Sequence, residues 1–214
     1  VEKNGRILHL GNAPPPEMAR GTDLVELGEK ALLPCFGDGH LHFSNWALVA
    51  TVFFDPREAG NFTELGGMIR DFSLRDRHSK ILAGFGLSQH SLEERRLITR
   101  EELDSFENDR PLYLLCYDGH SAVFNTRMLE NFPDPVKRSR GFDGDNGHVL
   151  HEAYFAATDY VTHTIAPLTL VKSIINGYDL LAARGIGMIH PVEGIGFPGD
   201  LDVAIVSFIA KAAA

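Results

Sequence analysis

Two histidines separated by one residue, in the segment LLPCFGDGHLHF at residues 32–43, are the most chemically suggestive feature of the chain. Side chains alternate between the two faces of a β-strand, so His40 and His42 are expected to point the same way. Two neutral imidazoles side by side at a strand end suit the binding of a divalent metal. Asp38 shares their face and is expected to orient a ligand histidine or to accept backbone N–H bonds nearby.

Purely structural roles would also account for these three residues. The imidazoles could be satisfied by hydrogen bonds at the strand end, and Asp38 could stabilise a turn between Gly37 and Gly39. A catalytic zinc site normally has three protein ligands, so two histidines alone would hold a metal weakly.

Polar side chains also follow three further apolar segments. His120 is the candidate catalytic residue, because a donor held at a strand end can stabilise a substrate carbonyl or its oxyanion; its alternative role is to anchor the turn at Asp118. His190 and Glu193 are candidates for substrate contact or for support of the ligands. Ser88, Gln89 and His90 follow the second apolar strand, and further candidates for the pocket are His90, His148, His151 and Glu152.

The elements that must position these residues alternate between apolar strands and helices. Strands are predicted at residues 32–37, 79–89, 110–117 and 185–192. Helical spacing of apolar residues predicts helices at 61–77, 99–110, around 124–129 and at 168–184, with Thr99 and Glu102 as a capping box and Thr63 as a second cap. Such alternation favours a parallel α/β architecture, in which active sites lie at the carboxyl ends of the strands.

The N-terminal region differs from this pattern. Asn4-Gly5 predicts a hairpin, and a short strand is predicted at residues 24–27, so residues 1–31 are expected to lie outside the main domain, which covers 32–214. Residues 133–152 are rich in Gly, Asp and Pro and are expected to form an excursion from the core. The absence of an initiator Met and the ending AKAAA suggest a piece of a longer protein.

Composition narrows the class of protein. The 214 residues, 44% of them hydrophobic, are enough for one sizeable core, and a net charge of -9 argues against nucleic-acid binding. No apolar run reaches the roughly 18 residues of a membrane span. Two cysteines, Cys35 and Cys116, make no disulfide framework and are expected to be buried thiols, so a cytoplasmic location is expected.

The segment LLPCFGDGHLHF resembles the first barrel strand of the amidohydrolase superfamily, which ends in a His-x-His metal motif, although Cys35 stands where that family usually has Gly. The segments KILAGFGLSQ, RPLYLLCYDGHSAVFNTRML, GHVLHEAYF and ARGIGMIHPVEG resemble, in order, parts of its amidohydrolase 3 (YtcJ-like) branch. The resemblance implies an α/β fold, a TIM-like (β/α)8 metallo-dependent hydrolase barrel that is incomplete here. It also implies that residues 1–31 form part of a small β-sandwich.

The same resemblance implies a hydrolase that cleaves C–N bonds of a small-molecule amide, formamide or cyclic amide with metal-activated water. His40 and His42 would be ligands of a divalent metal, and zinc, as one or two ions, is the metal that the resemblance leads us to expect. The family's later ligands, a carboxylated lysine and further histidines, and its aspartate base are not recognisable in this sequence, so the chain alone is expected to be inactive. A homo-oligomer is compatible with this interpretation.

Two other functions compete with this one. GIGFPG at residues 194–199, with Gly194, Gly196 and Gly199, fits the G-x-G-x-x-G pattern of a dinucleotide-binding turn, but Glu193 and Pro198 are poor companions for a pyrophosphate. The third class is a non-catalytic fragment or pseudo-enzyme with interaction roles only, because half a barrel leaves unpaired sheet edges.

Overall fold

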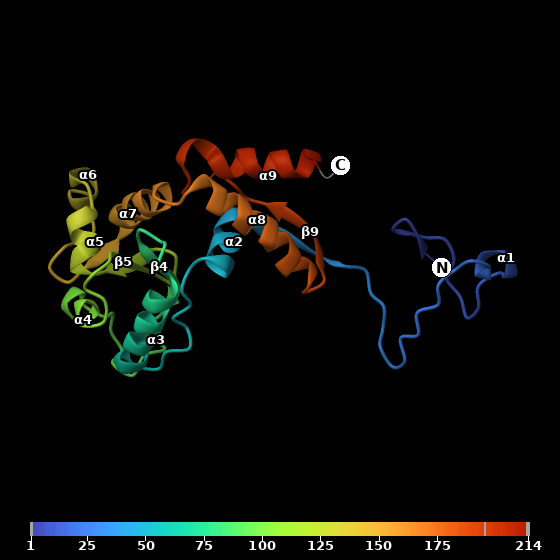
Figure 1. Ribbon diagram of the computed structural model, residues 1–214, viewed down its shortest axis with the longest axis horizontal. Helices are drawn as coiled ribbons and strands as arrows, with labels where there is room; N and C mark the ends of the chain where they lie inside the picture. Colours follow the sequence, from blue (N-terminus) through green and yellow to red (C-terminus); the bar gives the residue numbers. More distant parts are fainter. Residues whose placement is uncertain (1, 195, 213–214) are drawn as a thin grey trace. The chain divides into compact units, whose positions relative to one another are not determined.

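The computed structural model describes residues 2–194 and 196–212, and the chain forms two compact units, residues 1–35 and 36–214 (Figure 1). In the first unit, β1 (Glu2–Lys3) and β2 (Arg6–Ile7) form an antiparallel hairpin, followed by α1 (Pro16–Ala19). Asn4 and Gly5 both have positive φ, 54° and 75°, as the tight hairpin turn requires, which confirms the prediction from Asn-Gly.

The strand predicted at residues 24–27 is wrong. Leu24 is 85% exposed and no strand forms there, because the described part of this unit offers neither a ladder partner nor an apolar surface. The described residues of the unit contain only the two strands of the hairpin, so the β-sandwich expected for residues 1–31 is not confirmed.

The second unit contains the remaining elements. Its strands are β3 (Phe36–Leu41), β4 (Leu82–Leu87), β5 (Leu112–Cys116), β6 (Ser121–Phe124), β7 (Phe142–Asp143), β8 (His148–Leu150) and β9 (Ile186–Pro191). Its helices are α2 (Phe43–Thr51), α3 (Phe62–Arg75), α4 (Arg100–Asp104), α5 (Thr126–Asn131), α6 (Asp134–Lys137), α7 (His151–His163), α8 (Pro167–Ala182) and α9 (Leu201–Ala212), with a 3-10 turn η1 (Pro198–Asp200) before α9.

These strands form a mixed α/β structure with two separate sheets. β3 pairs with β9 in parallel, and the second sheet has the order β4-β5-β6-β8-β7. β4 and β5 are parallel, as predicted, whereas the pairs β5-β6, β6-β8 and β8-β7 are antiparallel. Within the described residues no closed barrel is therefore seen, and the (β/α)8 expectation is confirmed only as far as the α/β class.

The chain reverses directly after β5. Phe124, expected in a helix, lies fully buried in β6 opposite Tyr113, and the helix α5 begins only at Thr126. The predicted start of the helix is therefore wrong. Phe124 and Met128 are four residues apart, as on one face of a helix, but a buried residue at the end of a short strand gives the same spacing. Residues 133–152 form α6, β7 and β8, and β8 pairs with β6.

The second sheet is buried on both faces, because the residues of β5 alternate between two cores. Leu112 and Leu114 pack with Ile69 of α3, while Tyr113 packs on the opposite face with residues of α7 (Figure 1). The capping box at Thr99 and Glu102 is confirmed at α4. α3 is capped by Asn61, which replaces the predicted Thr63 and accepts a hydrogen bond from the Glu64 N–H.

The other sheet is fixed by a helix pair. α2 packs on α8, and a Cβ atom on Gly177 would lie 2.9 Å from the Ala47 Cβ, so only glycine permits this close approach. The predicted buried face of α8 is confirmed at Ile174 and Leu181 but is wrong at Ile175, which is exposed. The helix pair carries the apolar surface against which β3 and β9 lie.

The predicted bounds and burial of the first strand are wrong. β3 covers Phe36–Leu41 rather than 32–37, and Leu32 and Phe36 are 82% and 63% exposed. β3 is paired only with β9 among the described residues, so its other edge and part of its apolar surface remain open. Cys35 lies just before β3, outside the sheet, and is exposed, so its predicted burial is wrong, whereas Cys116 is buried as predicted.

Across residues 2–194 and 196–212, none of the helices combines the length and the apolar composition needed to cross a membrane.

Replacing Asn125 by alanine is expected to lower the free energy of unfolding by about 3 kcal/mol or more. This fully buried amide accepts hydrogen bonds from Leu112 N and Met128 N and donates to the carbonyls of Glu107 and Arg110, at 2.7–3.0 Å. The substitution strands all four backbone groups. Urea unfolding measures the loss, with the exposed Asn131→Ala as the control; a loss no larger than that of the control would contradict this account.

Candidate metal centre

The ladder between β3 and β9 carries the histidine pair. Asp38 is opposite Ile189 and Leu41 is opposite Pro191, and the pairing continues past β9 with a hydrogen bond from Val192 N to Leu41 O at 2.8 Å. The carboxyl ends of these two parallel strands therefore lie together, and the segment after β9 runs beside the histidines.

The His40 and His42 rings lie next to one another. Their centroids are 5.4 Å apart and their planes are inclined by 84°, and both side chains are exposed. His40 lies in β3, whereas His42 is the N-cap of α2. The two imidazoles are thus accessible to solvent and are not buried among apolar side chains.

The His42 ring has a defined tautomer. Its Nδ1 lies 3.1 Å from the Val192 carbonyl oxygen, and because a carbonyl can only accept, Nδ1 carries the proton and donates. With the proton on Nδ1, the lone pair of the neutral form of the ring lies on Nε2, where a metal can take it. A hydrogen bond of this kind from the non-ligating nitrogen fixes the orientation of metal-binding histidines in general.

Asp38 acts on the backbone of the site. Its Oδ1 accepts a hydrogen bond from the His40 N–H at 3.0 Å, so the carboxylate shapes the turn that carries the histidine. Asp38 thus accepts a hydrogen bond from the backbone, which is one of the two expectations for this residue, and it does not contact the imidazole ring of His40 through this bond.

Glu193 lies at the same end of the sheet. Its Oε1 accepts a hydrogen bond from the Ser44 N–H at 3.2 Å, in the first turn of α2, two residues after His42. Burial raises the pKa of the Glu193 carboxyl, the bonds from Ser44 lower it, and the neighbouring Asp202 carboxyl raises it further, for a net increase. His190 lies in β9 and is exposed.

His120 lies at the end of β5, in the other sheet. Asp118 Oδ1 accepts hydrogen bonds from the N–H groups of His120 and Ser121, at 2.9 and 3.1 Å, which defines the turn between β5 and β6. Burial by itself raises the pKa of Asp118, but these hydrogen bonds and that from the Ser121 hydroxyl outweigh it and lower the pKa below its ordinary value. His120 is exposed, with its ring 6.2 Å from that of Phe155.

The other candidates are scattered. His148 donates from Nε2 to the Ile98 carbonyl at 2.9 Å, a bond that supports the loop before α4. His151 and Glu152 begin α7 and are exposed, and His90 is exposed after β4.

Only part of a metal site is formed by these residues. His40 and His42 have the donor chemistry and the proximity of two ligands, so they fit a divalent metal. The portion of the chain that the structure describes contains no group of three His, Cys, Asp or Glu side chains able to hold a metal ion. The residues therefore fit as two members of a larger ligand set.

Two residues near the site escaped the sequence analysis. Ser44 and Asp202 are both completely buried, and both bind the segment after β9, Ser44 through Glu193 and Asp202 through the Gly194 N–H at 2.7 Å. The sequence offers one weak signal for Asp202, which lies in the first turn of α9 after a glycine-rich loop. Acidic residues are common in the first turn of helices in general, so this position does not indicate a functional role.

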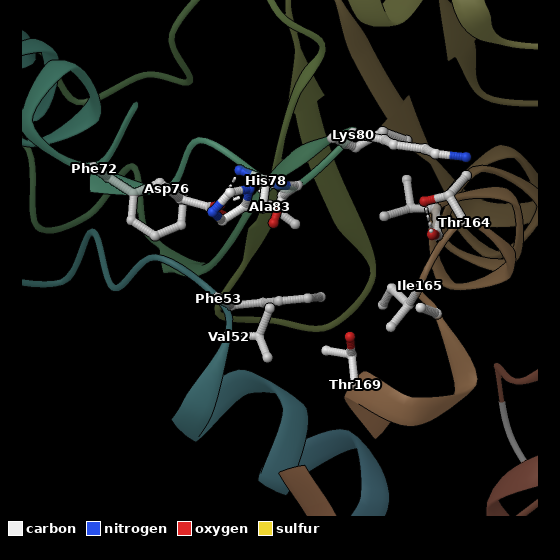
Figure 2. Close-up of a pocket in the computed structure, with 14 residues that line it drawn as sticks. Val52, Phe53, Phe72, Asp76, His78, Lys80, Ala83, Thr164, Ile165 and Thr169 are labelled. Carbon is white, nitrogen blue, oxygen red and sulfur yellow. Dashed lines mark hydrogen bonds between the residues drawn. The ribbon is translucent and has the colours of Figure 1, made fainter. Parts of the chain in front are cut away.

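A cavity lies away from these residues, near the start of β4. Figure 2 shows Val52 and Phe53 of the segment after α2 facing Ile165 and Thr169 across it. The complete lining consists of Val52, Phe53, Phe72, Asp76, His78, Ser79, Lys80, Ile81, Ala83, Val161, Thr164, Ile165, Ala166 and Thr169. None of the predicted site residues contributes to it.

Comparison with known proteins gives matches over most of the chain. A model of the Amidohydrolase family matches residues 23–201. The exoenzymes regulatory protein AepA of Pectobacterium carotovorum subsp. carotovorum is 25% identical over 165 residues, which cover 68% of this chain and 34% of that protein.

Two solved structures resemble this one. They are crystal structures of uncharacterized metal-dependent hydrolases from Pyrococcus furiosus (TM-score 0.61, 23% identity) and Pyrococcus horikoshii OT3 (TM-score 0.62, 24% identity). Each match covers 84% of this chain but only 35% and 34% of the respective neighbour, so the chain spans about a third of the length of its relatives. At these identities the likeness shows a common fold.

The Asp118→Ala variant is expected to lose about 1 kcal/mol of unfolding free energy at pH 7, because the turn loses its hydrogen-bond acceptor. A lowered pKa means that Asp118 stabilises the fold above its unfolded pKa of about 3.9 and that this contribution disappears as the pH falls through the lower folded value.

Urea unfolding at pH 7, 4 and 3 measures the difference, which should shrink towards zero with acidification. Asp145→Ala, which removes an exposed carboxylate from another turn, is the control. A difference between the Asp118 variant and the unaltered chain that stays constant with pH would contradict this role.

Proposed function

The chain belongs to the amidohydrolase family, and from that premise we propose that it supplies part of a metal-dependent hydrolase of C–N bonds. The substrate class is a small-molecule amide, formamide or cyclic amide. His40 and His42 are the first two ligands of a divalent metal, which we propose to be zinc. The observation that carries the proposal is the adjacent, solvent-accessible ring pair, with the Nε2 of His42 left free by its bond to Val192.

The chemistry that a divalent metal supplies in such a site is hydroxide available near neutral pH. The protein's own contribution begins with orientation. Val192 holds the ring of His42, and Asp38 holds the backbone of His40. Both imidazoles must be neutral to act as ligands, so acidification is expected to oppose metal binding.

His120 is proposed to donate a hydrogen bond to the carbonyl oxygen of the substrate. It is exposed, and the Asp118 turn fixes its backbone, so its ring is available to a ligand. In the structure, β5 and β3 belong to different sheets, so this role needs the two strand ends to meet around a substrate. Because the described residues provide two metal ligands only, we propose that this chain alone does not hydrolyse substrate.

The dinucleotide alternative finds no support. Ile195 of the 194–199 motif lies outside the described residues. The helix α9 follows the turn, as the helix of a dinucleotide-binding motif would. However, the carboxylate of Asp202 already takes the Gly194 N–H, and negative charge at this position opposes a pyrophosphate. A non-catalytic interaction role remains the competing proposal, and it predicts no specific metal binding.

Zinc titration of the chain by isothermal calorimetry tests the proposal. His40→Ala and His42→Ala are each expected to weaken zinc binding at least about tenfold, which corresponds to ~1.4 kcal/mol, because each removes one of two ligands. His163→Ala, at an exposed position on α7, is the matched control and should bind like the unaltered chain. Equal zinc affinity in all four proteins would refute the assignment and favour the interaction role.

A further inference from the structure

Three buried polar atoms behind the histidine pair have no hydrogen-bond partner among the described residues. They are Ser44 Oγ on α2, Glu193 Oε2 after β9 and Asp202 Oδ1 on α9. Ser44 and Asp202 are both completely buried, and Glu193 is partly buried. Unsatisfied buried polar atoms are costly, so three of them converging from separate elements need a physical explanation.

The hydrogen bonds that the two carboxyls do form suggest an explanation. Glu193 uses Oε1 to accept from Ser44 N, and Asp202 uses Oδ2 to accept from Gly194 N. The other oxygen of each carboxyl is left over. Asp202 holds the N–H of Gly194, the residue next to Glu193, which brings the two carboxyls close enough for Asp202 to raise the pKa of Glu193. Ionised carboxylates only accept hydrogen bonds, so two of them cannot satisfy each other.

Among the described residues, neither Glu193 nor Asp202 forms an ion pair with a lysine or arginine that would offset a second negative charge. α8 contributes Tyr178, whose pKa is raised by burial and by Glu193, and η1 contributes Asp200, whose Oδ1 would lie 3.7 Å from a Cβ on Gly194. The His42 ring on the α2 side donates from Nδ1 to Val192 O. Two like charges in contact at a buried position cannot both persist, as paired carboxyls in proteins generally demonstrate.

We propose that Glu193 and Asp202 share one proton, and that this carboxyl pair clamps the start of α2 behind His42. The proton joins the two leftover oxygens and satisfies both at once. Burial raises the pKa of Glu193 and the Asp202 carboxyl raises it further, against the opposing bonds from Ser44, which agrees with a proton retained there.

The clamp positions a proposed ligand. His42 is the N-cap of α2 but its side chain caps no backbone group, so the first N–H groups of the helix need another acceptor. Glu193 supplies it at Ser44, while the preceding residue Val192 holds the ring. Glu193 and Asp202 are therefore positioning residues, and this part of the inference rests on the proposed metal site.

Glu193→Gln tests the shared proton in metal-free protein. The amide can donate to Asp202 and accept from Ser44 at every pH, which copies the protonated pair. A carboxyl with a raised folded pKa stabilises the fold fully below its unfolded pKa of about 4.3 and loses that contribution as the pH rises through the folded value. The unfolding constant of the unaltered chain, relative to Glu193→Gln, should therefore grow by about tenfold or more between pH 4 and pH 8.

The exposed Glu58→Gln is the matched control, and its difference from the unaltered chain should stay flat with pH. If Glu193→Gln does not fold, Asp202→Asn makes the same comparison from the other carboxyl. In the unaltered chain, infrared spectroscopy at pH 5, above the unfolded pKa of about 4.3, should show a protonated carboxyl C=O band that is absent or weaker in either variant. A flat Glu193→Gln profile, the absence of that band, or stability set by added K⁺ or Ca²⁺ rather than by pH would overturn the proposal.

Zinc titration separates the clamp from the proposed function. Glu193→Ala should weaken zinc binding at least about tenfold, and Glu193→Gln should restore it. If the unaltered chain binds no zinc, the metal site fails while the metal-free pH profiles still decide the shared proton. If Glu193→Ala and Glu193→Gln weaken zinc binding alike, or neither weakens it, the positioning role is overturned.

Discussion

The parallel pairing of β3 with β9 is the interaction on which the candidate site depends. It joins segments about 150 residues apart, as measured by the bond between His42 and Val192. Closing so long a loop costs conformational entropy, and the packing of α2 on α8 offsets it with buried apolar surface. Without this ladder, His42 would lose its carbonyl partner and the start of α2 would lose Glu193.

Features of the fold that depend on nearby residues were predictable from the sequence. The turn at Asn4-Gly5, the capping box at Thr99 and the buried strands β4 and β5 each follow from a few consecutive residues. The errors arose where a distant surface decides the outcome. Leu24 and Leu32 look like strand residues, but strand formation and burial need a partner, and neither residue finds one in the described structure.

The candidate site likewise contains some features that the sequence predicts and others that depend on distant parts of the chain. Strand alternation predicted that His40 and His42 would point the same way, and their rings do lie 5.4 Å apart, although β3 ends at Leu41 and His42 is the N-cap of α2. Their supporting groups could not be predicted, because a backbone carbonyl at Val192 has no sequence signature and the contact between Glu193 and Ser44 joins two separate elements. The proposed roles of His120 and His190 remain predictions, and β5, which leads to His120, pairs in a different sheet from β3.

The fold itself contributes to the arrangement of the histidine pair. In small zinc domains the metal supplies much of the folding free energy, because the ligands are disordered without it. Here a hydrogen bond to Val192 already orients one imidazole, and the β3–β9 ladder fixes the strand that carries the other. The entropy of ordering the His42 ring and the backbone of His40 is therefore lost during folding. A further metal-ligating side chain that reaches this edge of the sheet would join donors that are already partly ordered. Less conformational entropy would then be lost when a metal binds, which favours a higher affinity.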